Sequence, residues 1–325
     1  MNAFDAPRFD AYVTEIVADS GRAAFALGEG VVAWEDGARV QAHDGAILAA
    51  VAHPSGQGVV TGGDDGRLVW SRPHDIRVLA EVPRKWVDAV AAAPVSGLIA
   101  FAAGREVHVL DVKAPDFRRV FSHDASVAAL AFDPKGRRLA TATYGGAALW
   151  YARIAEQKPV MLRWAGSHVA LAFSPDGRFL ISSMQEAALH GWRLSDARDM
   201  RMGVYPAKVR SLVFLGDAWL ATSGANGAVL WPFAGSNGPM GKQAMELGWD
   251  ESALVTRVAG DPRGETLVVG LDDGRIWASH LPSERRVTLR AEKGPPISAL
   301  TVVGHDRVAW GDEEGGAGVL GLEGG

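Results

Sequence analysis

A layout of about 40 residues repeats along this chain, and this repetition constrains the fold more than any other feature. Turns of the Pro-x-Gly type, or close variants, occur at Pro54, Pro94, Pro134, Pro175 and Pro262, with spacings of 40, 40, 41 and 87 residues. A second marker, the residue that closes each unit, runs in phase with the first, at Trp34, Trp70, Leu110, Trp150, Trp192, Trp231, Trp277 and Leu320. The sequence therefore predicts eight units.

Each unit is typical of four short antiparallel strands. In residues 59–70, 220–231 and 267–277, apolar runs flank an Asp-Gly or Asn-Gly turn, which supplies the positive φ that a tight hairpin needs. The first strand of a unit is rich in alanine, as in residues 47–52, so that the strands can crowd around an axis. The pattern predicts an all-β chain, with residues 1–325 forming a single β-propeller domain.

The strand count also predicts how the ring closes. Eight units are present, but only seven outer strands follow them, because the chain stops after the third strand of the last unit. An unpaired strand edge favours aggregation, so residues 1–11 are expected to supply the missing outer strand. We therefore expect eight four-stranded blades closed by an N-terminal strand. The alternative is seven blades, with an irregular first unit at residues 12–34.

Composition excludes several classes of protein. The net charge is −5, which disfavours non-specific binding to nucleic acid or to an anionic membrane. No cysteine is present, so disulfides, thiolate metal sites and a cysteine nucleophile are excluded. We see neither a secretory signal nor an apolar run long enough to cross a membrane, and we expect a cytoplasmic protein. The high alanine and glycine content is typical of a GC-rich bacterial source.

Motifs for catalysis are missing from the sequence. It contains no nucleophile elbow, P-loop, dinucleotide fingerprint or zinc-protease motif. The nine histidines are scattered, without the close pairing that metal ligands show. We therefore expect a protein that is not an enzyme and that holds no cofactor or metal.

The units resemble the repeats of the WD-repeat propeller family. The resemblance lies in "DDG" at residues 64–66 before Trp70, "NG" at 226–227 before Trp231, and "DDGRIW" at 272–277. His43 and His123 match the histidine that precedes the inner strand in that family. The resemblance implies a structural hydrogen-bond tetrad of His43, Thr61, Asp64 and Trp70. It also implies that the ring serves as a protein-interaction scaffold.

Aromatic residues at the entry to inner strands are the candidate binding residues. Trp86, Trp164, Tyr205 and Trp249 occupy comparable connections between units, and Arg84 and Arg163 lie beside two of them. Trp, Tyr and Arg are enriched at protein-binding hot spots. The sequence thus predicts a non-catalytic, monomeric ring that binds another protein of unknown identity, and no nucleic acid or membrane. The alternative is a propeller enzyme, such as a lactonase-like hydrolase, or a binder of a small ligand or metal in the axial channel.

Overall fold

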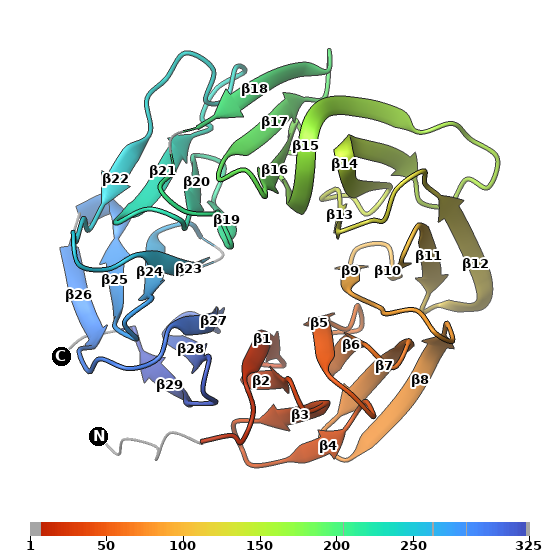
Figure 1. The fold of residues 1–325 in the computed structure, drawn as a ribbon, viewed down its shortest axis with the longest axis horizontal. Coiled ribbons are helices and arrows are strands. Elements are labelled where there is room, and N and C mark those ends of the chain that lie inside the picture. The colour runs from red at the N-terminus through yellow and green to blue at the C-terminus, as the bar shows by residue number, and fades with distance from the viewer. Residues whose placement is uncertain (1–7, 204, 262, 284, 323–325) are drawn as a thin grey trace.

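The computed structural model is a ring of β-sheets around a central axis (Figure 1). It describes residues 8–203, 205–261, 263–283 and 285–322. The elements follow in chain order as strands, apart from one short 3-10 helix, η1 (Leu281–Ser283). In the described residues, no helix has both the length and the hydropathy to cross a membrane.

The strands closest to the axis come from eight places in the chain. They are β1 (Val13–Asp19), β5 (Ile47–Ala52), β9 (Ala89–Ala93), β13 (Ala129–Phe132), the second half of β15 (Val160–Phe173), β19 (Leu212–Leu215), β23 (Val255–Gly260) and β27 (Ile297–Val303). Strands of the second position are β2 (Arg22–Leu27), β6 (Val59–Gly63), β10 (Leu98–Ala103), β14 (Arg138–Tyr151), β16 (Phe179–Met184), β20 (Trp219–Thr222), β24 (Thr266–Leu271) and β28 (Arg307–Asp312).

The outer half of each unit completes the sheets. Strands of the third position are β3 (Val31–Trp34), β7 (Arg67–Arg72), β11 (Glu106–Asp111), β17 (Leu189–Arg193), β21 (Ala228–Pro232), β25 (Ile276–His280) and β29 (Ala317–Gly321). The outermost strands are β4 (Arg39–Gln41), β8 (Asp75–Glu81), β12 (Ala114–Ser122), β18 (Arg198–Met202), β22 (Met245–Leu247) and β26 (Arg285–Arg290). All pairs are antiparallel, as the hairpin pattern predicts.

The number of separate sheets is seven, so the prediction of eight separate four-stranded blades is corrected to the alternative count. Five sheets have four strands, one has three, and β13 to β18 form one six-stranded sheet. The fourth unit lacks an Asp-Gly turn, and β14 runs through Tyr144 as one strand that provides both middle strands of that unit. Its partner β15 is first the outer strand of the fourth unit and then the innermost strand of the fifth. The eight sequence units are thus all present, but two share a sheet.

The core is distributed among clusters of apolar side chains between neighbouring sheets. One such cluster joins Val109 of β11 to Leu139 and Trp150 of β14. The closing tryptophans Trp34, Trp192 and Trp277 are almost fully buried. Aromatic residues at these positions fill the wide outer space between sheets, while alanine serves near the axis.

The ends of the chain meet between the first and last units. The Ser298 hydroxyl donates to the carbonyl of Val13 at 2.7 Å, and Thr301 donates to Ile16 at 2.8 Å. Arg8 forms an antiparallel bridge with Gly316, and the Phe9 amide donates to Gly315 at 2.8 Å. The remainder of the predicted closing strand, residues 1–7, lies outside the described residues.

Candidate functional site on the loop face

One face of the ring carries every predicted binding residue. Because neighbouring strands are antiparallel, the connection from an outermost strand to the next innermost strand lies at the same end as the turn between the second and third strands. Two contacts confirm this proximity: the Val87 amide donates to Gly63 at 3.0 Å, and Lys85 Nζ lies 2.6 Å from Glu106 Oε2. We call this end of the ring the loop face.

The predicted tryptophans are exposed to different degrees. Trp86 is 64% exposed and Trp249 is 57% exposed. Trp164 is 36% exposed, since one side of its indole stacks on the buried His190 ring with centroids 4.0 Å apart. Arg84 and Arg163 are exposed beside them. The connections of Trp86 and Trp164 are two units apart, whereas Trp249 precedes β23 on another part of the ring.

The prediction that Tyr205 binds a partner is wrong, because its side chain is buried. Its hydroxyl lies 2.8 Å from Thr222 Oγ1 and accepts a hydrogen bond from Trp231 Nε1 at 2.7 Å. Burial raises the pKa of Tyr205 to about 12. The residue therefore stands where the other units place a histidine and joins the hydrogen-bond network inside its own unit.

The predicted tetrad also needs correction at two of its four members. His43 Nε2 lies 2.8 Å from Thr61 Oγ1, as expected, but His43 Nδ1 contacts Asp65 at 2.9 Å rather than Asp64. Burial opposes ionisation of Asp65, but the hydrogen bond from His43 and those from backbone amides bring its pKa below the usual range. Trp70 donates instead to the carbonyl of Gln57 at 2.8 Å.

Related networks occur in the next units with different members. In the fourth unit, His123 Nε2 lies 2.9 Å from Thr141 Oγ1, and Trp150 Nε1 lies 3.2 Å from the same histidine nitrogen. In the fifth unit, His168 Nδ1 lies 2.7 Å from Ser182 Oγ. These histidines therefore have structural partners, which leaves them a role in packing the units.

A groove of about 530 Å³ lies on the loop face and includes Lys85, the residue before Trp86. Its lining residues are Lys85, Gly104, Arg105, Glu106, Ser122, His123 and Ser126. Glu106 is paired with Lys85, and the hydrogen bond from that ammonium lowers the pKa of Glu106. Arg105 is exposed and makes no ion pair with the described residues. Burial lowers the pKa of His123, so this wall of the groove is neutral at pH 7.

Sequence reasoning missed two residues of this surface, Arg105 and Tyr144. Lys85 and Arg105 line the groove, and Tyr144, 71% exposed, stands at the bend of β14. Tyr144 pairs with Ser167, three residues after Trp164. The sequence offered one signal for Tyr144: it occupies a turn position where other units have an acidic residue. We call the surface formed by Trp86, Lys85, Arg105, Tyr144 and Trp164 the aromatic arc.

Two acidic turn residues of the loop face, Asp272 and Asp273, are engaged in local structure. Asp272 accepts the amide of Leu254 at 2.9 Å, and Asp273 contacts Arg275 at 2.8 Å. In the described part of the chain, no group of three or more histidine or acidic residues is arranged to hold a metal ion. Other acids of this face, such as Glu313 and Glu314, are exposed, so the basic and aromatic character belongs to the aromatic arc rather than to the whole face.

Comparison with known proteins supports the architecture. The WD40 family (WD domain, G-beta repeat) matches residues 35–70 and 116–150. The crystal structure of the computationally designed Ika8 protein has a TM-score of 0.77 and 18% sequence identity, over 97% of this chain and 98% of that chain. A search of curated proteins found no match. The two matched segments end at Trp70 and Trp150, in the units that hold the His43–Thr61 and His123–Thr141 contacts. The chain is therefore a single β-propeller with two WD40 repeats, consistent with a WD-repeat propeller family.

Proposed function

We propose that this propeller is a non-catalytic scaffold that binds another protein through the aromatic arc. The observation that carries the proposal is Trp86, a large apolar ring that is 64% exposed and follows Lys85, which lines a groove together with Arg105. Aromatic and arginine side chains dominate binding energy at protein interfaces because they bury a large area at a small cost in conformational entropy.

The backbone around Trp86 supports this role. Arg84 has φ 65°, a left-handed conformation that costs a non-glycine residue on the order of 1 kcal/mol or more. The turn is held by the Lys85 amide, which donates to Val82 at 3.2 Å, and by the Val87 amide on Gly63. A turn fixed from both sides presents Lys85 and Trp86 in a preformed arrangement, which lowers the entropy lost on binding.

Charge indicates what kind of segment fits. Lys85 and Arg105 line the groove, Arg84 precedes Lys85 in the chain, and Glu106 neutralises Lys85. A segment with an acidic side chain for the groove and an apolar side chain for Trp86 complements this surface. We further propose a monomeric ring in the cytoplasm that binds neither nucleic acid nor membrane, as the net charge favours.

The test begins with a partner that is identified by crosslinking and then purified. Trp86→Ala and Arg105→Ala are each expected to weaken the affinity of this partner at least tenfold in titration calorimetry, the loss typical of a hot-spot residue. Trp249→Ala is the matched control, since it removes an equally exposed indole elsewhere on the loop face. Unchanged affinity in both arc variants, or a loss only in Trp249→Ala, would contradict the proposal.

A further inference from the structure

Two charged residues occupy positions near the axial channel where the equivalent residues of other units are alanine. Five innermost strands have a register shift near their start. In each strand, one residue resumes the pairing after the shift, and these residues are Glu15, Ala49, Ala170, Arg257 and Ala299. Equivalent register places these residues at the same level of the ring. Close packing near the axis favours alanine at this level. Crowding therefore does not explain why Glu15 and Arg257 have long charged side chains there.

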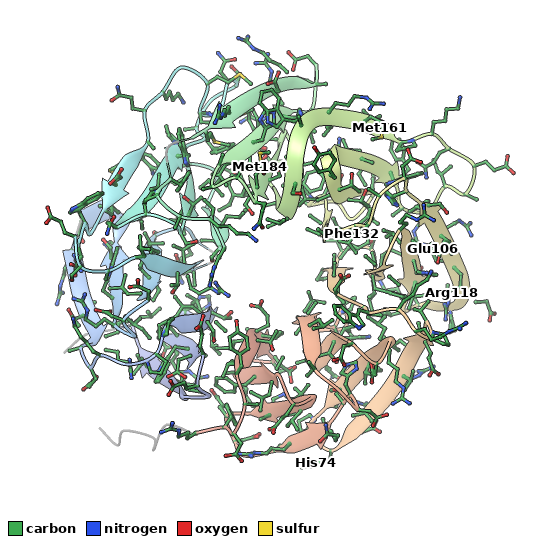
Figure 2. All side chains as sticks on the ribbon, in the orientation of Figure 1. His74, Glu106, Arg118, Phe132, Met161 and Met184 are labelled. Carbon is green, nitrogen blue, oxygen red and sulfur yellow. The ribbon has the colours of Figure 1, made fainter. Side chains whose placement is uncertain are left out.

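Both charged residues line a cavity of about 420 Å³. Its wall is formed by segments of β1, β15, β19, β23 and β27, and it also includes Arg210, which precedes β19. With all described side chains drawn, the centre of the ring remains open (Figure 2). The cavity therefore faces the axial channel, where a small molecule can enter.

The polar groups of the cavity divide into those that are engaged and those that remain available. Ser211 and Thr301 donate their hydroxyls to the carbonyls of Val258 and Ile16. Arg257 Nη1 donates to the carbonyl of Thr256 at 3.1 Å. Within the described residues, Arg257 has no carboxylate within ion-pair distance, and Arg210 has one at 3.8 Å, Glu313.

Glu15 belongs to the same group of charges. It can reach water through the channel, yet protein atoms crowd it on several sides, and this desolvation raises its pKa. The positive charge of Arg257 opposes that effect and lowers the pKa of Glu15, and both side chains line the same cavity. Two guanidinium groups on one side and a carboxylate on the other are arranged for a ligand with both an anionic end and a donor group.

We propose that this cavity binds a small carboxylate or phosphate anion that also carries a hydroxyl or ammonium group. Arg257 and Arg210 bind the anionic oxygens, because guanidinium groups match carboxylate and phosphate in geometry and charge. Glu15 accepts a hydrogen bond from the donor group of the ligand. The site is separate from the aromatic arc and does not depend on the proposed partner.

Titration calorimetry at low ionic strength with citrate, glycerol 3-phosphate and inorganic phosphate tests the proposal and distinguishes the two anion types. We expect saturable binding of citrate or glycerol 3-phosphate to the full chain, weaker binding of inorganic phosphate, and at least a tenfold loss in Arg257→Gln and in Arg210→Gln. Glu15→Gln is expected to reduce the preference for the ligands with a hydroxyl group over inorganic phosphate.

Arg118→Ala is the matched control, since it removes an arginine from the outermost strand β12, far from the axis (Figure 2). Circular dichroism and the melting temperature without ligand show that each variant is folded. Saturable binding that Trp86→Ala leaves unchanged supports a separate channel site. No saturable binding of any probe, binding that survives in both Arg257→Gln and Arg210→Gln, or an equal loss in Arg118→Ala overturns the proposal.

Discussion

At the scale of single residues, one arrangement recurs in four units with different chemical members. In each of these units, a hydroxyl on the second strand donates a hydrogen bond to a carbonyl of the third strand. The same hydroxyl also contacts a ring side chain that lies near the start of the innermost strand. The hydroxyls belong to Thr61, Thr141, Ser182 and Thr222. Their partners are His43, His123, His168 and Tyr205. A phenol can replace an imidazole because both provide a ring and a polar atom at the same depth.

His190 is the exception among the buried histidines, because both of its ring nitrogens lack a hydrogen-bond partner in the described structure. Burial lowers its pKa to about 4, although Asp199, 3.6 Å away, partly opposes the shift. The folded protein therefore holds His190 neutral, while the unfolded chain takes up a proton near pH 6.5. The stabilisation is complete above pH 6.5 and is lost as the pH falls towards 4.

We predict that His190→Phe removes this part of the pH dependence. Phenylalanine keeps a ring to stack on Trp164, so the variant is expected to be about as stable as the parent protein at pH 7. At pH 5 the variant should be more stable than the parent protein by about 2 kcal/mol, from the pKa shift. Urea unfolding at both pH values measures the difference. His190→Gln removes the titrating group but does not keep the ring, so it separates the effect of charge from the effect of shape. Parallel pH profiles of stability for the parent protein and both variants would contradict the prediction.

At the scale of elements, the shared sheet of the fourth and fifth units depends on two glycines at the bend of β14. Both have positive φ, 88° at Gly145 and 138° at Gly146. A Cβ at Gly145 would meet nothing, whereas a Cβ at Gly146 would collide with the carbonyl oxygen of Leu162 on β15. This close approach of the two backbones lets β15 pair with β14 up to the bend at Tyr144.

The two glycines therefore form a matched pair for mutation. Gly145→Ala is expected to destabilise the protein by about 1 kcal/mol, from backbone strain alone. Gly146→Ala should lower the free energy of unfolding by about 3 kcal/mol or more, because the new Cβ adds a collision with β15 to the backbone strain. Equilibrium unfolding in guanidinium chloride, followed by tryptophan fluorescence, measures both. Equal losses would show that the approach of β14 to β15 is not tightly constrained.

At the scale of the whole molecule, stability is shared among interfaces between neighbouring sheets, as in repeat proteins. The ring differs from an open array because its first and last units contact each other. Phe9 packs with Phe25 at a centroid distance of 5.5 Å, and Arg307 contacts Glu35 at 3.1 Å. Among the described residues, this junction joins the first unit to the last unit, so its loss is expected to open the ring.

We predict that deletion of residues 1–11 lowers the melting temperature, because it removes the buried Phe9 ring and the Arg8–Gly316 bridge that lies just before β29. Phe9→Ala alone should cost about 3–5 kcal/mol, as expected for a buried aromatic residue. Val95→Ala, at an exposed position, is the control and should change the stability by less than about 0.5 kcal/mol. A deletion variant with an unchanged melting temperature would contradict closure by the N-terminal segment.

The sequence by itself determined the all-β repeat and the positions of the hairpins, because strand periodicity and turn chemistry are local. Only the tertiary structure decided which acid meets His43, that Tyr205 turns inward, and that two units share one sheet. It also decided that Glu15 and Arg257, 242 positions apart in the sequence, face the same cavity. These outcomes depend on how neighbouring sheets approach one another around the axis, and no local stretch of the chain encodes that distance.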